Sequence, residues 1–438
     1  MALTITMYPA GNGDTFLIRY ATRDGERLTV ILIDGGYVST FRDHVVPDLA
    51  RLAQSGGMID LAVATHIDAD HVSGLIHFFK ENGPAEEPRI VPVHEVWHNC
   101  LRSIPMRVVS EASGASSTLS QGDSELLRMV RRRGYPRPVG EKSAASEISA
   151  LQGSSLAALL LGGGYKWNGE EGRMPIVASP RMSRRIGPDI DVTVLGPTPI
   201  RLEELSNWWR NQLRHIGYTG PIFPTAQFDD AFEFLIASGE RVSDRSLRPL
   251  SGKRHDLDRS LSDPELGRTY TPDTSITNGS SISLMVRVGK MRVLLLGDAW
   301  APDTEAALRE AFASDEPNDT SESDSTAGAE PTPGERAVSV VFDAIKVSHH
   351  GSRYNTSPAL LGWIDAPRFL ISTDGERHHH PDIEVLRAIV DRPATFRREL
   401  FFNYRTPASE RMKSYATRPG ATFSVHEGVR KINLGEEG

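Results

Sequence analysis

Apolar residues in the first hundred positions follow two periods, one typical of strands and one typical of helices. Runs rich in β-branched residues predict strands at 3–8, 15–20, 28–36, 59–66 and 89–99. Helical spacing predicts a helix at 42–56, which Pro47 interrupts, and a second helix at 69–83, which ends at Gly83. Strands that alternate with helices in this way predict an α/β fold.

The same pattern returns in the second half of the chain. Further strands are predicted at 190–199, in a hairpin at 280–299, and in the segments 340–352, 367–381 and 421–428. Helices are predicted at 200–217, 302–313 and 382–392. Both halves run strand, strand, helix, strand, which predicts a duplicated α/β layer. We therefore predict a single domain over 1–438, with insertions at about 100–187 and 200–277.

Composition narrows the class of protein. The 438 residues are 39% hydrophobic, and no apolar run approaches the length of about 18 residues that a membrane span requires. The N-terminus lacks the basic and apolar regions of a secretory signal. Cys100 is the single cysteine, so no internal disulfide is expected. These features favour a cytoplasmic protein without a membrane partner.

The net charge of −8 is unevenly distributed. Residues 314–336 are acidic and rich in Ser, Thr and Pro, which predicts a flexible surface loop. Two basic runs, at 128–138 and 179–188, can face the phosphates of a nucleic acid. The alternative is that both runs are solvated surface.

Polar clusters follow five of the predicted strands. They are Asp34, the segment His66–His71, Asp298, His349 with His350, and His378–His380. In open α/β sheets, the loops beyond the carboxyl ends of strands form the functional crevice. Histidine and carboxylate side chains that converge from several such loops are typical of a metal site.

The spacing within these clusters suits two divalent ions. His66 and Asp68 point the same way from an extended segment, and Asp70 and His71 can turn toward a second ion. Asp298 can bridge two ions with its two oxygens. The alternatives are that Asp68 or Asp70 caps the following helix, and that the paired histidines are ordinary loop residues.

The sequence resembles a known family. "THIDADHVSGL" is similar to the His-x-His-x-Asp-His signature of the metallo-β-lactamase fold, in a His-x-Asp-x-Asp-His form. "GNGDTFLI" and "ILIDGG" before it, and "VTVLGPTP", "NGSSISLMV", "VLLLGDA", "IKVSHHGS" and "HHHPDIEVL" after it, occur in an order that resembles the hydrolase domain of ComEC-type DNA-uptake proteins. The resemblance runs from about residue 5 to 390, outside the insertions.

The resemblance implies a four-layer αβ/βα sandwich with a metal site at one edge. It implies metal ligands at His66, Asp68, Asp70, His71, Asp298 and His380, with one of His349 and His350 at the metal or the scissile group. It also implies that Asp34 lies beneath the site and orients ligands by hydrogen bonding. Asp68 replaces the usual second histidine, so manganese becomes plausible beside zinc. The separate third histidine has His98 as a candidate; otherwise His98 is a strand-end hydrogen-bonding residue.

These residues lead to a metal-dependent hydrolase as the first functional hypothesis. A hydroxide bound at a dinuclear Zn²⁺ or Mn²⁺ site would attack a phosphodiester, which makes a phosphodiesterase or nuclease our first choice. Asp70, His349 and His350 are the expected catalytic residues, with a histidine of the pair acting near the leaving group.

Two other hypotheses remain open. The same fold can act on a small substrate: a cyclic nucleotide, a phosphoester, a lactone or a thioester. A protein of another class, an effector or interaction protein with little turnover that a protein partner regulates, would also carry a metal. The sequence does not decide the oligomeric state.

Overall fold

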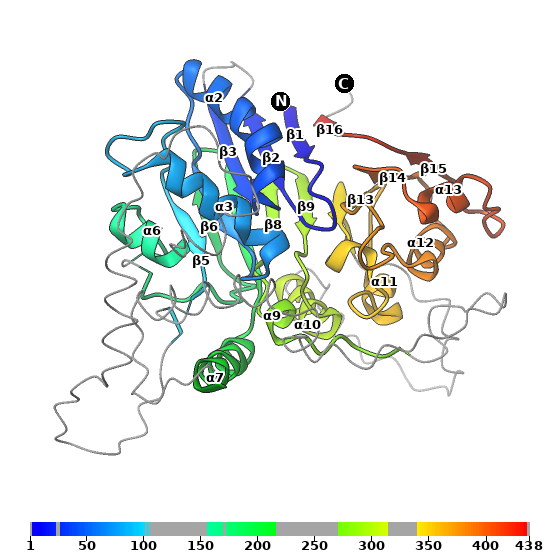
Figure 1. Ribbon diagram of the computed structural model, residues 1–438. Helices are drawn as coiled ribbons and strands as arrows, with labels where there is room; N and C mark the ends of the chain where they lie inside the picture. Colours follow the sequence, from blue (N-terminus) through cyan, green and yellow to red (C-terminus); the bar gives the residue numbers. More distant parts are fainter. Residues whose placement is uncertain are drawn as a thin grey trace, which may run out of the picture.

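The structure is a computed structural model, which describes residues 2–22, 27–100, 103–104, 156–169, 172–215, 270–313 and 340–435. Figure 1 shows the helices on the outside and the strands between them. Among the described residues, no helix is both long enough and apolar enough to cross a lipid bilayer. The predicted basic run at 128–138, the acidic loop at 314–336 and most of both predicted insertions lie outside the described residues.

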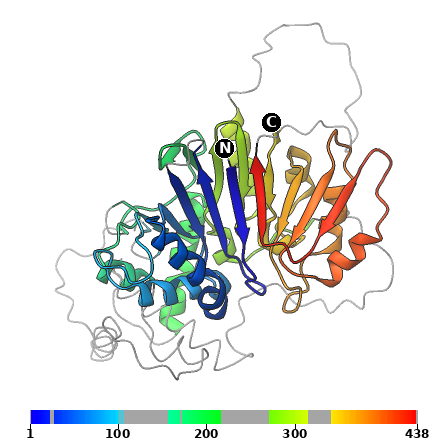
Figure 2. The ribbon, with the colours of Figure 1, turned by 90° about the horizontal axis from the view of Figure 1, so that it is seen from above.

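The first sheet has six strands in the order β16-β1-β2-β3-β4-β5. Their bounds are β1 Ala2–Met7, β2 Phe16–Ala21, β3 Leu28–Ile33, β4 Leu61–Ala64, β5 Val96–His98 and β16 Lys431–Gly435. β1 pairs antiparallel with both β2 and the C-terminal β16, while β3, β4 and β5 run parallel. Figure 2 shows β16, in red, beside the N-terminal strands in blue.

The second sheet has eight strands in the order β15-β14-β13-β11-β9-β8-β7-β6. Their bounds are β6 Ser183–Ile186, β7 Ile190–Gly196, β8 Ser283–Val288, β9 Met291–Leu295, β11 Ala344–Lys346, β13 Arg368–Ile371, β14 Arg398–Phe402 and β15 Phe423–His426. The strands from β9 to β15 are parallel, so their carboxyl ends lie at one edge. β10 (Val340–Val341) and β12 (Ile364–Asp365) form a separate parallel pair.

Helices surround both sheets. They are α1 Val38–Thr40, α2 Val46–Gln54, α3 Ala69–Asn82, α6 Leu156–Gly162, α7 Pro199–His215, α9 Ile276–Gly279, α10 Ala301–Phe312, α11 Pro358–Trp363, α12 Ile383–Val390 and α13 Pro407–Lys413, with a π-helical turn η1 at Phe41–Val45 and a 3₁₀ turn η2 at Ser348–Gly351.

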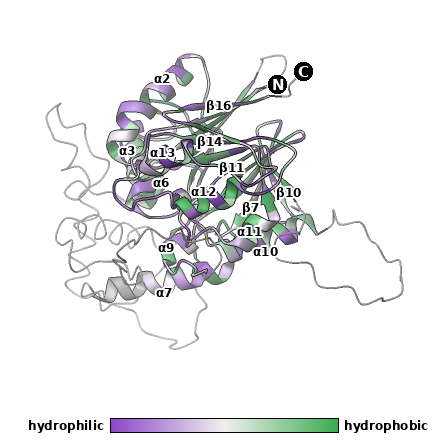
Figure 3. Ribbon diagram, turned by 90° about the vertical axis from the view of Figure 1, so that its right-hand side faces the viewer, coloured by the Kyte–Doolittle hydropathy of each residue, from purple (hydrophilic) through white to green (hydrophobic). Residues whose placement is uncertain are grey.

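Three apolar cores separate these layers. Alternate residues of the strands, such as Ile31 in β3 and Val286 in β8, fill the space between the sheets. The neighbour Leu32 points the other way and packs against Leu75 of α3. α10, α11 and α12 cover the outer face of the second sheet, where Leu386 belongs to the core. Figure 3 shows green, hydrophobic strands between helices that carry purple, hydrophilic surfaces. The predicted four-layer αβ/βα sandwich is confirmed.

Some helices and strands begin or end at residues other than those predicted from the sequence. The helix predicted at 42–56 begins earlier, because the π-helical turn η1 precedes α2 and Pro47 sits in the first turn of α2, where it is tolerated. Only Val96–His98 of the predicted strand 89–99 pairs in the sheet. β14 and β16 were not predicted, because these segments form strands through pairing with strands that are distant in the sequence.

Gly74 lets α3 lie directly on the loop after β3, and this contact gives a prediction. A Cβ atom at Gly74 would lie 2.0 Å from the carbonyl oxygen of Gly35. The backbone of α3 or of the loop at Gly35 would have to move to make room for the added methyl group. We therefore expect Gly74→Ala to lower the free energy of unfolding by about 1–3 kcal/mol, measured by urea denaturation. Gly362→Ala is the control, since its Cβ would meet no atom within 4 Å. Equal stabilities of the two variants would contradict the prediction.

Candidate metal centre

The candidate metal centre lies where both sheets present the carboxyl ends of parallel strands. Asp34 follows β3, His66 follows β4, Asp298 follows β9, and the pair His349 and His350 follows β11. Two sheets that end at the same edge thus bring together side chains from both halves of the chain.

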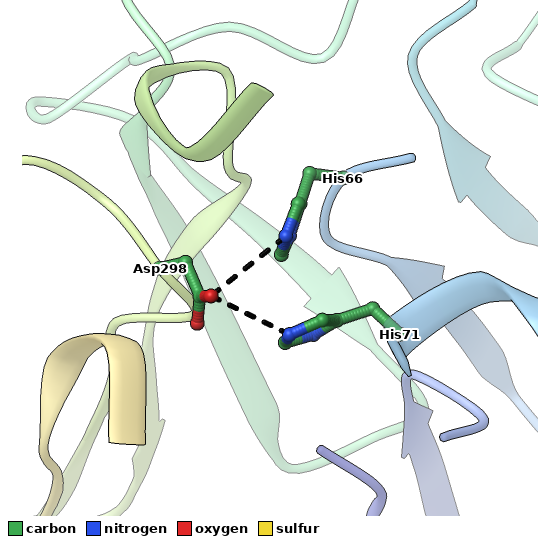
Figure 4. A group of neighbouring side chains, drawn as sticks. All are labelled: His66, His71 and Asp298. Atoms are coloured by element: carbon green, nitrogen blue, oxygen red, sulfur yellow. Dashed lines mark ion pairs between the residues drawn. The ribbon is translucent and has the colours of Figure 1, made fainter. Parts of the chain in front are cut away.

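Four histidine Nε2 atoms surround one oxygen of Asp298. Their distances to Asp298 Oδ2 are 3.8 Å for His66, 3.5 Å for His71 and 3.7 Å for both His349 and His350. Figure 4 draws two of these contacts. They exceed the span of a direct hydrogen bond, about 2.7–3.2 Å. Atoms that share one cation at about 2.1 Å lie roughly 3.0–3.5 Å apart, which is close to these values.

Hydrogen bonds at Nδ1 orient the two histidines of the first half. His71 donates to Asp34 Oδ2 over 2.8 Å. Thr65 Oγ1 donates to the same carboxylate, so its oxygen accepts from His66 Nδ1 at 3.0 Å. Both Nε2 atoms therefore present a lone pair when the rings are neutral.

The histidines of the second half are oriented in the same way. His350 Nδ1 donates to the carbonyl of Ser372 over 2.7 Å. His349 Nδ1 donates to Asn355 Oδ1 over 2.8 Å, and the Asn355 amide nitrogen is turned away to Asp273. When the rings are neutral, four imidazoles therefore aim their lone pairs at one carboxylate oxygen.

Adjacent histidines can converge only because their backbone leaves the extended form. In a strand, successive side chains point to opposite faces. His349 has φ 45° and His350 has φ 55°, both in the left-handed region that non-glycine residues rarely adopt. This conformation costs of order 1–3 kcal/mol per residue and persists at sites where the arrangement has a use.

The residues present fit a bound cation. The Nε2 atoms of His66, His71 and His350 are buried and make no hydrogen bond. Buried polar atoms are normally paired, and lone pairs that face a carboxylate repel one another. A divalent ion among these atoms would remove both costs. His66, His71 and Asp298 form one group of close ligand atoms, and Asp70, His71 and His350 form another.

The pKa values show how strongly this cluster attracts positive charge. Burial lowers the pKa of His71, but Asp298 and Asp34 outweigh burial and raise it well above its usual range. Burial also lowers the pKa of His349, but Asp298 and Asp273 outweigh burial and raise it above its usual range. Burial raises the pKa of Asp298, yet the neighbouring histidines hold it well below its usual range.

Asp68 and Asp70 lie at the start of α3. Asp68 is the N-cap residue, but its side chain makes no capping bond; its Oδ2 accepts from Thr277 and lies 3.6 Å from His66 Nε2. Asp70 Oδ2 accepts from Asn12 Nδ2 over 2.7 Å. Asn12 is itself oriented by the hydroxyl of Tyr37, which donates to its Oδ1. Helix capping therefore does not explain Asp68.

A buried ion pair beneath the cluster was not anticipated from the sequence. Lys346 Nζ pairs with Asp14, donates to the carbonyl of Gly297 over 2.9 Å, and lies 3.7 Å from Asp298 Oδ1. Burial raises the pKa of Asp14, but Lys346 and His350 lower it below its usual range. The available signal was a lysine within the apolar strand β11, where a charge needs a partner.

Two predicted ligands lie apart from these groups. The ring of His380 is 5.3 Å from that of His349, and its Nδ1 lies 3.5 Å from Asp382 Oδ2. His98 is buried at the end of β5 with its ring stacked against Trp167 at 6.2 Å. Within the described part of the chain, no group of close ligand atoms includes His98 or His380.

The basic run at 179–188 is paired with acidic side chains. Arg181 lies 3.2 Å from Glu310, and Arg185 lies 2.8 Å from Asp191. Arg184 also packs over the ring of Trp97. These contacts favour the interpretation of this run as solvated surface.

Comparison with known proteins bears on the first half of the chain. Residues 8–140 match the family described as the metallo-beta-lactamase superfamily, a segment that holds His66 to His71. The match supports a metal-dependent hydrolase. A solved structure, Zn²⁺-bound PqqB from Methylobacterium extorquens, is similar at 12% identity and a TM-score of 0.34, over 99% of this chain and 100% of that one. No curated protein matches the chain.

The raised pKa values of His71 and His349 predict how metal binding depends on pH. A histidine whose pKa is raised in the folded protein stabilises the metal-free fold. This stabilisation is fully present below the pKa of the unfolded chain, about 6.5, and is lost as pH rises through the pKa of the folded state. A metal ion that binds His71 Nε2 must displace the proton there, and its positive charge opposes the proton on His349. We expect the increase in Tm on adding Zn²⁺ or Mn²⁺ to stripped protein to grow from about pH 6 to about pH 8.5. An increase independent of pH would contradict this.

The hydrogen bond between Asp34 and His71 predicts a loss of metal affinity. Asp34→Asn keeps the shape but removes the carboxylate that orients the ring, so we expect affinity to fall by about 10–100-fold, measured by chelator competition. Asp60→Asn is the matched control, because Asp60 is a buried acid that accepts from the amide of Val30. Equal affinities in both variants would show that Asp34 does not support the site.

Proposed function

We propose that this protein is a phosphodiesterase that uses two divalent metal ions, with a nucleic acid as its substrate class. The convergence of four Nε2 atoms on Asp298 Oδ2 carries the proposal. The match to the metallo-beta-lactamase superfamily supports hydrolysis. The resemblance of the ordered motifs to the ComEC-type hydrolase domain supports the choice of a phosphodiester.

The charge of the centre favours two ions. Six aspartates surround it: Asp14, Asp34, Asp68, Asp70, Asp273 and Asp298. Lys346 neutralises one of these charges, which leaves five when the histidines are neutral. One divalent ion supplies two positive charges, so two ions offset the negative charge more fully than one. Imidazole suits Zn²⁺, and the large share of carboxylates also suits Mn²⁺.

His66 and Asp68 would hold one ion, Asp70, His71 and His350 would hold the other, and Asp298 would serve both. When bound, such ions lower the pKa of a coordinated water and neutralise charge on a phosphoryl group. His98 is not needed in this assignment.

Exposure distinguishes the two histidines of η2. The side chain of His350 is 2% exposed, whereas that of His349 is 23% exposed. The buried His350 is suited to bind a metal, while His349 is also open to a bound substrate. We therefore propose that His349 Nε2 holds the proton that passes to the leaving oxygen, while Asn355 fixes its ring.

Hydrolysis of bis-p-nitrophenyl phosphate tests the proposal. Metal-stripped protein is given Zn²⁺ or Mn²⁺, and we expect turnover that needs the metal. Loss of a ligand costs more than loss of its supporting partner, so Asp70→Asn should lower kcat/KM by more than about 100-fold. Asp374→Asn, on the loop that leads to His380, is the control and should retain activity, because among the described residues the side chain of Asp374 accepts a single hydrogen bond, from the amide of Glu376.

Each outcome has a clear meaning. Turnover in the control but not in Asp70→Asn supports the phosphodiesterase. Absence of turnover in folded, metal-loaded wild type would overturn it, and lactones, thioesters and an effector that awaits a protein partner would then be tested.

A further inference from the structure

A cavity lies beside the candidate metal centre, between the loop that precedes α12 and the helix α13. It has a volume of about 140 Å³. Its lining includes His379, His380, Ile383, Pro407 and Arg411. The cavity is therefore polar on one side and apolar on the other.

His380 joins this cavity to the metal centre. Its ring lines the cavity and lies 5.3 Å from the ring of His349. His349 in turn places Nε2 at 3.7 Å from Asp298 Oδ2. The cavity and the metal centre are thus separated by the rings of His380 and His349.

Arg411, an exposed residue of α13, brings a positive charge to the cavity. Among the described residues, its guanidinium makes no hydrogen bond and no ion pair, in contrast to the other cations around α13. Lys413 pairs with Glu410 and Glu427, and Arg405 pairs with Glu410. Asp382, the acid in the cavity wall, already accepts from the amide of Arg353 and lies near His380.

The backbone at His379 is held in an uncommon conformation on the cavity wall. Its φ of 58° lies in the left-handed region, which costs a non-glycine residue of order 1–3 kcal/mol. Strain of this kind gathers at ligand-binding segments. The cavity therefore combines an unpaired guanidinium with a strained histidine that can donate a hydrogen bond.

We propose that the Arg411 cavity binds a second phosphate group of the substrate, next to the phosphodiester at the metal centre. The forked donors of a guanidinium match phosphate oxygens, and histidine adds a further N–H donor. The apolar wall of Ile383 and Pro407 suits the sugar between two phosphates. The second phosphate can belong to the next nucleotide of a polynucleotide or to the end of a single nucleotide. This inference rests on the proposed function.

Two chromogenic esters that differ by one phosphate test this site. One is the p-nitrophenyl ester of thymidine 5′-phosphate, and the other carries an added 3′-phosphate. With metal-loaded wild type, we expect KM to be about tenfold lower for the ester with the added phosphate. Arg411→Gln should abolish this preference and leave kcat/KM for the simpler ester unchanged. Arg405→Gln is the matched control, since Arg405 is exposed and paired with Glu410.

A preference that survives in Arg411→Gln, or is absent from wild type, would overturn the proposal. Oligothymidylates of increasing length distinguish a phosphate within a polynucleotide from the terminal phosphate of a single nucleotide. KM falls further with a following nucleotide only if the site binds a polynucleotide. If wild type hydrolyses neither ester, the proposed phosphodiesterase activity is contradicted, and this outcome does not yet decide whether the cavity binds phosphate. Calorimetric binding of thymidine 3′,5′-bisphosphate to wild type and Arg411→Gln then decides the cavity: weaker binding by the variant supports it, and equal binding overturns it.

Discussion

The arrangement of four imidazole lone pairs around Asp298 is the constraint on which the site depends. With neutral rings and no cation these groups repel one another, and Asp298 and three of the four histidines are buried, so water cannot relieve the repulsion there. The protein holds them by hydrogen bonds at the opposite ring nitrogen, to Thr65, Asp34, Asn355 and Ser372. Each bond fixes both the position of a ring and the nitrogen that is left to bind metal.

The two sheets serve this constraint directly. β3 and β4 deliver Asp34 and His66, while β9 and β11 deliver Asp298 and the histidine pair. Because ligands from both halves would share the same ions, binding free energy would also hold the two sheets together. The hydrogen bond from Ser372 Oγ to the carbonyl of Gly13 joins the halves at the same edge.

The sequence allowed the strand ends that carry the candidate ligands to be predicted, because each ends an apolar run with a polar cluster. Most of the supporting groups were beyond its reach. Asn355 and Ser372 are ordinary loop residues until the fold places them behind His349 and His350. Asp14 and Lys346 are 332 positions apart and become a pair only when the sheets close. Such contacts depend on tertiary packing, which local periodicity does not encode.

Backbone strain and polar pairing together explain why neighbouring histidines have different surroundings. The left-handed turn brings His349 and His350 to one oxygen, although a strand would separate them. The same turn leaves His349 at the surface and buries His350 against Asp14, which lies 3.4 Å from its Nδ1. Asp34, beneath the metal centre, and His379, on the wall of the Arg411 cavity, are also left-handed. Four of the five left-handed non-glycine residues among the described ones thus lie at the metal centre or at that cavity, where a rigid scaffold can hold ligand-binding groups in positions that an unstrained loop would not keep.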